Sequence, residues 1–139
     1  MLEFLQEYGL LLAGLVLVGV VLFKGPIMLR LYRIGSVDPA SAVNLINRQE
    51  ARVLDVREDR EWQQGHIPDA VHVPLGQLGS RMGELEACKG ADTPLVVVCR
   101  SGNRSAMAAV RLRKAGFESV YNLEGGTMAW QQAGMPLES

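Results

Sequence analysis

The sequence has few residues of the kinds that define several common protein classes. It contains only two cysteines, Cys88 and Cys99, too few for a disulfide framework, and this favours a reducing compartment. The two histidines, His66 and His72, are not accompanied by paired cysteines, so no metal-ligand spacing is present. Basic residues number 14 and acidic residues 15, and the net charge of −1 leaves no broad basic field for a nucleic acid. We therefore expect no metal, no cofactor and no nucleic-acid partner.

The length and composition bound the number of domains. The chain has 139 residues, which suit one small domain with an appendage rather than two full domains. Hydrophobic residues make up 48% of the chain and charged residues 21%, both ordinary for a globular protein. The apolar residues are unevenly distributed, because the stretch from Leu10 to Phe23 carries no charge. The appendage is therefore expected at the N-terminus.

The N-terminal segment predicts a membrane-anchor helix over residues 1–24. Tyr8 to Phe23 gives 16 uncharged residues, which as a helix would span roughly 24 Å of a hydrocarbon core about 30 Å thick. Leu2 and Leu5 can extend this apolar stretch outward, and Lys24 can reach the headgroups at the other end. We expect a retained single-pass anchor that makes the membrane one partner of this protein.

The residues after this helix predict its orientation. Gly25-Pro26 is expected to break the helix, and residues 25–33, with Arg30 and Arg33, are expected to form a basic juxtamembrane linker. Basic residues follow the apolar helix and none precedes it. The positive-inside rule then predicts an inner (cell) membrane protein whose main domain faces the cytoplasm.

Two other interpretations of the N-terminal segment remain. A cleaved signal peptide requires a positively charged start and a small-residue cleavage site, whereas this segment begins with Glu3 and Glu7. A buried helix of a soluble protein is also compatible with such a short apolar run.

Residues 34–139 predict a domain of alternating strands and helices. Asp38-Pro39 is typical of a helix start, with an N-cap followed by proline. The expected strands cover residues 51–56, 71–73, 95–98 and 119–123. The other expected helices cover residues 58–64, 74–87, 128–133 and a stretch from Asn103 or Ser105 to near Gly116. This alternation predicts an α/β domain with a mainly parallel sheet, whose sites lie beyond the carboxyl ends of its strands.

The strongest of these strands, Leu95–Val98, runs directly into Cys99. Gly102 allows a tight turn close to a ligand, and the following helix adds positive potential at its N-terminus. Arg100 and Arg104 add two permanent charges. Each of these features favours a thiolate over a thiol, and the thiolate is the competent nucleophile. The sequence therefore predicts a catalytic cysteine at position 99.

A cysteine at the end of a hydrophobic strand is often only a small buried apolar residue. That interpretation suits Cys88, which no glycine and arginine pair follows. Around Cys99 the strand, glycine, arginines and helix occur together, which favours the functional interpretation.

The loop Cys99–Ser105, CRSGNRS, resembles the active-site loop of single-domain rhodaneses. Further segments resemble this family in the same order: Leu54-Asp55-Val56-Arg57, Glu61-Trp62, Gly65-His66-Ile67-Pro68-Asp69-Ala70, Val73-Pro74-Leu75, Ala115-Gly116-Phe117, Leu123-Glu124-Gly125-Gly126 and Trp130. The similarity covers about residues 34–137, and Asp69 stands where the family more often has glycine. Residues 34–139 are therefore identified as a rhodanese-like domain.

The resemblance implies a five-stranded parallel sheet with helices on both faces. It also implies a thiosulfate sulfurtransferase-type transferase, in which Cys99 forms a persulfide with sulfur from thiosulfate or a related donor and passes it to a thiol or cyanide. The implied partners are a small sulfur-containing anion and a thiol acceptor. The implied substrate-binding residues follow Cys99 in the loop: Arg100, Ser101, Gly102, Asn103, Arg104 and Ser105.

Two other functions remain as alternatives. One is a membrane-tethered sulfur carrier or binding module without turnover. The other is a phosphatase or arsenate reductase. That related branch is marked by five residues between the cysteine and the arginine, whereas four separate Cys99 from Arg104. The shorter loop favours a sulfur-sized target and hence sulfur transfer.

Asp55 and Arg57 are supporting candidates, since both end a strand near the expected site. They are expected either to orient Arg104 or shape the pocket, or only to brace the junction between strand and helix as an ion pair. His66 is expected to form local hydrogen bonds that fix its loop.

Overall fold

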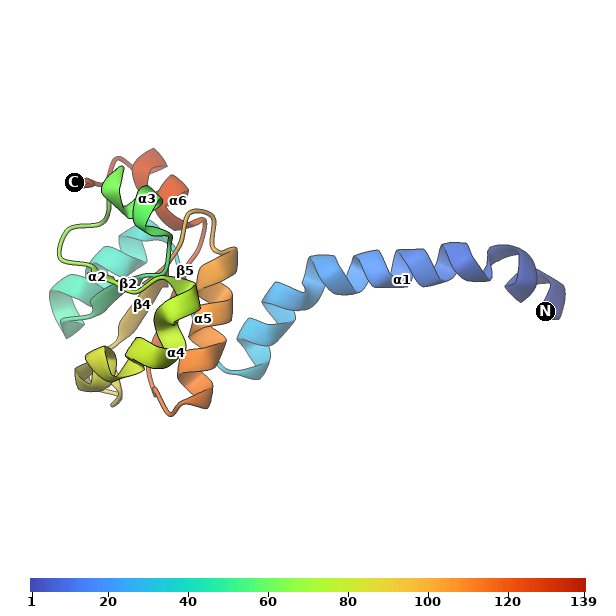
Figure 1. The fold of residues 1–139 in the computed structure, drawn as a ribbon, viewed down its shortest axis with the longest axis horizontal. Helices are drawn as coiled ribbons and strands as arrows, with labels where there is room; N and C mark the ends of the chain where they lie inside the picture. Colours follow the sequence, from blue (N-terminus) through green and yellow to red (C-terminus); the bar gives the residue numbers. More distant parts are fainter.

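The computed structural model describes residues 1–22 and 29–139 in full. Its first element, helix α1, is assigned from Leu2 to Leu31 and extends away from the rest of the molecule (Figure 1). Its C-terminal end reaches helix α5, Asn103–Lys114. The break expected at Gly25-Pro26, and with it the first part of the 25–33 linker, falls outside the fully described residues.

The apolar part of α1 is exposed. Residues Leu2–Leu22 form a stretch of 21 residues with a mean hydropathy of 2.0, long and apolar enough to cross a membrane. None of this stretch is buried inside the structure, so it contributes nothing to the core of the domain. This helix is compatible with an anchor or a signal sequence, and its exposure gives no support to a buried core helix.

The C-terminal end of α1 behaves differently, because it packs on the domain. Leu29 of α1 and Tyr32, which directly follows the helix, lie against the hydrophobic core. The Arg113 side chain of α5 donates to the Tyr32 carbonyl at 3.0 Å. The Lys114 ammonium lies 5.2 Å from the centre of the Tyr32 ring, a cation–π contact. The packed part of the chain therefore includes Leu29 and Tyr32, which the sequence placed in the linker. The division at residue 34 stays a prediction.

The domain is built on a five-stranded parallel sheet in the order β1-β5-β4-β2-β3. The five strands are β1 Gly35–Val37, β2 Arg52–Asp55, β3 Val71–His72, β4 Leu95–Val98 and β5 Val120–Leu123. β4 lies at the centre, and all four of its residues are buried. A strand covered on both faces has no polar side to show, which explains the uninterrupted LVVV sequence.

Helices cover both faces of the sheet. The α-helices of the domain are α2 Pro39–Gln49, α3 Asp59–Gln63, α4 Leu78–Arg81, α5 Asn103–Lys114 and α6 Gly126–Gln132. α4 and α5 contribute to the core on one face together with Leu95 and Val97, whereas α2 and α6 contribute to the core on the other face with Val96 and Val98. The expected α/β architecture with a five-stranded parallel sheet is thus confirmed.

Two parts of the fold differ from the pattern read in the sequence. The region expected as one helix at 74–87 consists of the 3-10 turns Leu75–Gln77 and Met82–Cys88 on either side of α4. Glycine weakens a helix by about 1 kcal/mol per residue, and this region contains Gly76, Gly79 and Gly83. The region therefore forms short turns instead of one continuous helix.

The second difference is strand β1, which the pattern analysis missed. Its three residues include Gly35, and glycine has a low strand propensity. Glycine is required there because a Cβ would overlap the ring of Tyr121 on the neighbouring strand β5. The strand is defined by pairing with β5, a contact between distant parts of the chain.

Candidate active site

The turn after β4 directs backbone N–H groups at the sulfur of Cys99. Gly102 adopts a φ of +105°, a conformation that side chains other than glycine rarely take, and it caps α5. The Gly102 N–H donates to Cys99 Sγ at 3.0 Å, and the Ser105 hydroxyl lies 3.3 Å from the same sulfur. The structure therefore brings Cys99, Gly102 and Ser105 together.

These hydrogen bonds decide the acidity of the thiol. Burial of Cys99 raises its pKa, because a charged sulfur is poorly solvated inside the protein. Hydrogen bonds from the Ser105 hydroxyl act in the opposite direction, and so do those from the backbone N–H groups of residues 105, 102 and 101. The hydrogen bonds outweigh burial, so the pKa of Cys99 lies below its ordinary value. Cys99 is thus prepared to react as a thiolate.

A buried asparagine on β5 joins this network. Ser105 Oγ donates to Asn122 Oδ1 at 2.5 Å, and Asn122 Nδ2 donates to the Gly102 carbonyl at 3.2 Å. Ser105 and Asn122 are both buried. Asn122 was not predicted from the sequence, because it lies on β5, far along the chain from the Cys99 loop, and belongs to no local motif. Only the pairing of β4 with β5 brings it to the site.

The start of α6 forms backbone hydrogen bonds with the Cys99 loop. The N–H groups of Thr127 and Met128 donate to the carbonyls of Cys99 and Arg100 at 2.8 and 3.1 Å. A Cβ at Gly126 would overlap the Cys99 carbonyl oxygen, so only glycine allows this close approach of the two backbones. The Gly125-Gly126 pair therefore has a structural role in holding the Cys99 loop.

The side chain of Arg104 is engaged in an ion pair that the sequence did not predict. Its two terminal nitrogens donate to the carboxylate of Glu61 at 2.6 and 2.8 Å, in the paired geometry that is strongest for arginine and carboxylate. The hydrogen bonds from Arg104 lower the pKa of Glu61 to about 2. Glu61 is the acidic partner of the loop, and its only sequence signal was its place in the Glu61-Trp62 segment.

Asp55 and Arg57 form a separate buried pair. Arg57 donates to both carboxylate oxygens of Asp55, at 2.8 to 3.0 Å, and also to the carbonyl of Gly65 at 2.7 Å. This pair braces the junction between β2 and α3, as one of the two expectations had it. Among the described residues, the recorded hydrogen bonds of Arg104 go to Glu61 and not to Asp55. The alternative in which Asp55 orients Arg104 therefore gains no support.

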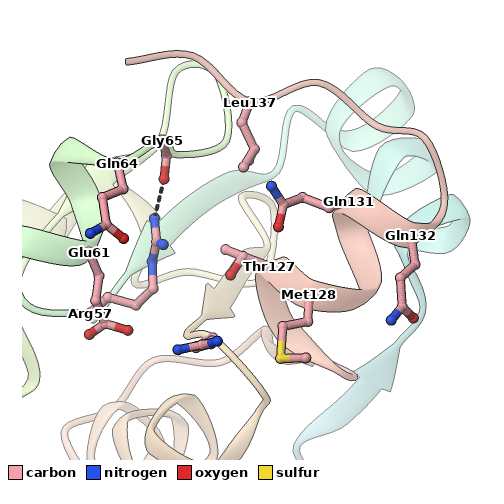
Figure 2. Close-up of a pocket in the computed structure, with 10 residues that line it drawn as sticks. Arg57, Glu61, Gln64, Gly65, Thr127, Met128, Gln131, Gln132 and Leu137 are labelled. Carbon is pink, nitrogen blue, oxygen red and sulfur yellow. Dashed lines mark hydrogen bonds between the residues drawn. The ribbon is translucent and has the colours of Figure 1, made fainter.

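A cavity of about 420 Å³ lies beside the loop (Figure 2). Arg57, Glu61 and Gln64 flank one side of it, and Thr127 and Met128 of α6 flank the other. The full lining is Arg57, Glu61, Gln64, Gly65, Arg100, Thr127, Met128, Gln131, Gln132 and Leu137. Arg57 is thus part of the cavity wall, and its supporting role stays a prediction.

The six residues predicted to bind substrate occupy different environments. Arg100 is exposed and lines the cavity, whereas Ser101 and Asn103 are exposed without lining it. Cys99 itself has no exposed surface and is not part of the cavity wall. Arg100 is therefore the one residue of these six that lines the cavity, and the sulfur of Cys99 is covered in this conformation.

Next to this cavity, three aromatic rings are stacked. The Trp62 ring lies parallel to those of His66 and His72, with centroids 3.5 and 4.5 Å apart. His66 Nδ1 lies 3.1 Å from the Trp62 carbonyl, and the backbones of His66 and Glu138 pair in an isolated bridge. His66 thus has the local role expected for it, which is to fix its loop against the C-terminus. Among the described residues, no cluster of His, Cys, Asp and Glu suited to a metal ion is present.

Comparison with known proteins identifies the family. Residues 38–133 match the rhodanese-like domain. A sulfurtransferase of Allochromatium vinosum is 37% identical over 93 residues, covering 67% of this chain and 83% of that protein. The crystal structure of thiosulfate sulfurtransferase from Pseudomonas aeruginosa superimposes with a TM-score of 0.70 at 30% identity, covering 83% of this chain and 22% of that one.

Two further relatives match a smaller part of their length. An uncharacterised protein of Synechocystis is 44% identical over 92 residues, 66% of this chain and 49% of that protein. The putative sulfur carrier protein YrkF of Bacillus subtilis is 39% identical over 82 residues, 59% of this chain and 42% of that protein. The match therefore spans less than half the length of each of these two relatives. The matched domain, the parallel sheet and the loop after β4 together establish that this chain belongs to the rhodanese-like domain family, whose sulfurtransferase members support a role in sulfur transfer.

Proposed function

We propose that this protein is a sulfurtransferase in which Cys99 carries the transferred sulfur as a persulfide. The observation that supports the proposal most directly is the set of hydrogen-bond donors around Cys99 Sγ, which lowers the pKa of a thiol that burial alone would raise. A thiolate is required for attack on a sulfane sulfur.

The first half-reaction loads the enzyme. The Cys99 thiolate attacks the outer sulfur of thiosulfate, a new S–S bond forms, and the S–S bond within thiosulfate breaks. Sulfite leaves with the electron pair of the broken bond, and the negative charge on the enzyme moves to the outer sulfur of the persulfide. The loop N–H groups that surround the sulfur are fixed donors, and such donors stabilise developing charge without reorganisation.

The second half-reaction unloads it. An acceptor thiolate, or cyanide, attacks the outer sulfur of the persulfide and forms a bond with it. The bond to Cys99 Sγ breaks, and Sγ leaves as a thiolate, which restores the starting enzyme. The product is a persulfide or thiocyanate, and the thiolate returns to the Gly102 N–H and Ser105 hydroxyl that hold it at the start.

We expect both substrates to approach from the 420 Å³ cavity, because Arg100, the residue next to Cys99, lines its wall. Arg100 is exposed on its wall and supplies a permanent positive charge that attracts an anionic donor. Arg104 is already paired with Glu61, so its charge is largely neutralised and its main role is to fix α5 against α3. Among the six loop residues, Arg100 is therefore the main candidate for binding the anion.

We further propose that α1 anchors the domain in a membrane. The 21 residues Leu2–Leu22 would form about 31 Å of helix, and none of them is buried in the domain, so their apolar side chains face water unless lipid covers them. The basic residues that follow, including Arg30 and Arg33, favour a cytoplasmic position for the domain in the inner (cell) membrane. Residues 1–24 would be the anchor and residues 25–33 a basic juxtamembrane linker.

The anchor is tested by extraction of membranes at alkaline pH. The full-length chain should stay with the membrane fraction, and a protease added from the cytoplasmic side should remove the domain. Recovery of the full-length chain in the soluble fraction would exclude the anchor, and recovery of a chain that lacks residues 1–22 would support a cleaved signal sequence instead.

A sulfur carrier is the second candidate, because one relative carries that name. Both functions need the persulfide, so only turnover separates them. Mass spectrometry after thiosulfate treatment should show one added sulfur on the Cys99 peptide, and steady-state transfer to cyanide should proceed over many cycles. Persulfide formation without turnover would support the carrier, and absence of added sulfur with every donor would reject both.

A further inference from the structure

The hydroxyl of Ser105 has one hydrogen and two buried neighbours that can accept it. Cys99 Sγ lies 3.3 Å away on one side, and Asn122 Oδ1 lies 2.5 Å away on the other. A serine hydroxyl donates one hydrogen bond and accepts up to two. Because Ser105 is fully buried, water cannot supply a second donor, and the two acceptors compete for the same hydrogen.

The orientation of the Asn122 amide is determined by its other contact. Asn122 Nδ2 donates to the Gly102 carbonyl at 3.2 Å, and the reversed amide would place an oxygen against this carbonyl oxygen. The acceptor Oδ1 therefore faces Ser105, and the assignment rests on the hydrogen-bond network rather than on the similar shapes of the two ends. Asn122 thus presents an acceptor to the hydroxyl and a donor to the loop.

The position of the hydrogen depends on the charge of the sulfur. With Cys99 as a thiol, its S–H donates to Ser105 Oγ, and the Ser105 hydrogen goes to Asn122 Oδ1 at the short distance observed. With Cys99 as a thiolate, the sulfur has no hydrogen, and the Ser105 hydroxyl must rotate to donate to it. In the persulfide the charge moves to the outer sulfur, and Sγ becomes a weak acceptor.

We propose that Asn122 is a positioning residue for sulfur transfer, which accepts the Ser105 hydrogen whenever Cys99 Sγ is uncharged and releases it when Sγ is a thiolate. This inference rests on the proposed function, since it assigns a role to each charge state of the cycle. Only rotation of one O–H bond is involved, and no atom is oxidised or reduced. The same amide holds the Gly102 carbonyl, so the loop that carries the Gly102 N–H stays aligned in every state.

The test is a double-mutant cycle with the acidity of Cys99 as its readout. The pH dependence of thiolate absorbance, or of alkylation at Cys99, is measured in the full-length protein and in the Asn122→Asp, Ser105→Ala and combined variants. Aspartate is a stronger acceptor than the amide, so it should hold the hydrogen and raise the pKa of Cys99 by roughly one unit. Isosteric Asn122→Leu offers no acceptor and should lower this pKa.

The combined variants decide the inference. If Asn122 acts through the Ser105 hydrogen, Asn122→Leu should lose most of its effect in the Ser105→Ala background. Asn122→Asp should have a clearly smaller effect there, because only the direct repulsion between its buried charge and the thiolate remains. An equal effect with and without the hydroxyl would show that Asn122 acts only through its charge or its packing, and would overturn the proposal. The same aspartate substitution at Asn47, which is exposed on α2, is the control for the added charge.

Two safeguards keep the result interpretable. If Asn122→Leu fails to fold, the comparison of Asn122→Asp with and without Ser105 still tests the coupling, and circular dichroism identifies which variants are folded. The readout also does not require sulfur transfer. Failure of the wild-type protein to form a persulfide would reject the proposed function, whereas absence of coupling between positions 122 and 105 would reject this inference alone.

Discussion

The two cysteines of this protein are both buried and both free, yet their surroundings differ. Cys88 ends the 3-10 turn Met82–Cys88, where burial raises its pKa and only the charge of Arg52 opposes that effect. Cys99 is more deeply buried, but hydrogen bonds lower its pKa below the ordinary value. Burial alone therefore produces an inert thiol, and fixed hydrogen-bond donors produce a reactive one.

The difference has a structural origin. Cys99 follows the central strand β4 and precedes Gly102, whose left-handed backbone conformation allows the chain to turn into α5. Because of this turn, successive N–H groups point back at the sulfur. Cys88 lies at the end of a turn on one face of the sheet, among apolar core residues. The lowered pKa of Cys99 thus depends on the junction between β4 and α5.

The largest expected effect comes from removing each sulfur in turn. Cys99→Ser should abolish persulfide formation and sulfur transfer completely, because the bond-forming atom is lost. Cys88→Ser should leave both intact, apart from a modest loss of stability. Mass spectrometry after thiosulfate treatment measures the result, and an added sulfur on Cys88 in the wild-type protein would invalidate the contrast between the two sites.

The next effect comes from disturbing the loop while keeping its sulfur. Gly126→Ala places a methyl group into the Cys99 carbonyl at a φ of +58° and should cost roughly 3 kcal/mol or more in the free energy of unfolding, with loss of the lowered pKa. Gly134→Ala is the matched control, since its φ is also positive but nothing lies near its Cβ. We expect it to cost about 1 kcal/mol. Thermal unfolding and the pH dependence of alkylation measure both, and equal losses would show that α6 does not hold the loop.

A direct comparison of the two thiols gives a smaller but measurable difference. The rate of alkylation by iodoacetamide, followed peptide by peptide across pH, should rise at lower pH for Cys99 than for Cys88, because the pKa shifts of the two thiols have opposite directions. The absolute alkylation rate at Cys99 also depends on how often the sulfur becomes accessible to solvent, because it has no exposed surface in the structure. Coincident pH profiles would contradict the role assigned to the hydrogen bonds.

The smallest expected effect concerns the pair between Arg104 and Glu61. The pKa of Glu61 falls from an ordinary 4.5 to about 2 in the folded protein. A carboxyl with a lower pKa in the folded state favours folding while it is ionised. The contribution of Glu61 to the free energy of unfolding is therefore complete above pH 4.5 and is lost as the pH falls toward 2. Glu61→Gln should remove this pH dependence.

Because the pair is partly exposed, the expected change is at most about 1 kcal/mol. Chemical denaturation at pH 6 and at pH 3 measures it. Glu84→Gln, in the more exposed pair with Arg81, is the control and should change the pH dependence less. A larger effect at Glu84 than at Glu61 would show that the Arg104 pair has no special importance for the loop.

Local sequence predicted those features that depend on neighbours along the chain. Three of these features are each encoded within a few consecutive residues: the buried strand Leu95–Val98, the Asp38 cap of α2 and the loop around Cys99. Short strands and glycine-rich turns were harder to predict from the sequence. Strand β1 exists only through its pairing with β5, and the glycines of residues 74–87 divide the expected helix.

The sequence by itself determined that a cysteine follows a buried strand and opens a glycine-containing loop, and that a long apolar segment precedes the domain. Only the tertiary structure decided which groups surround the sulfur. Asn122 reaches it through the pairing of β4 with β5, Glu61 engages Arg104 from α3, and the backbone of α6 holds the loop at Gly126. These contacts join residues far apart in the chain, so no local pattern specifies them, and they form only when the sheet and its helices pack together.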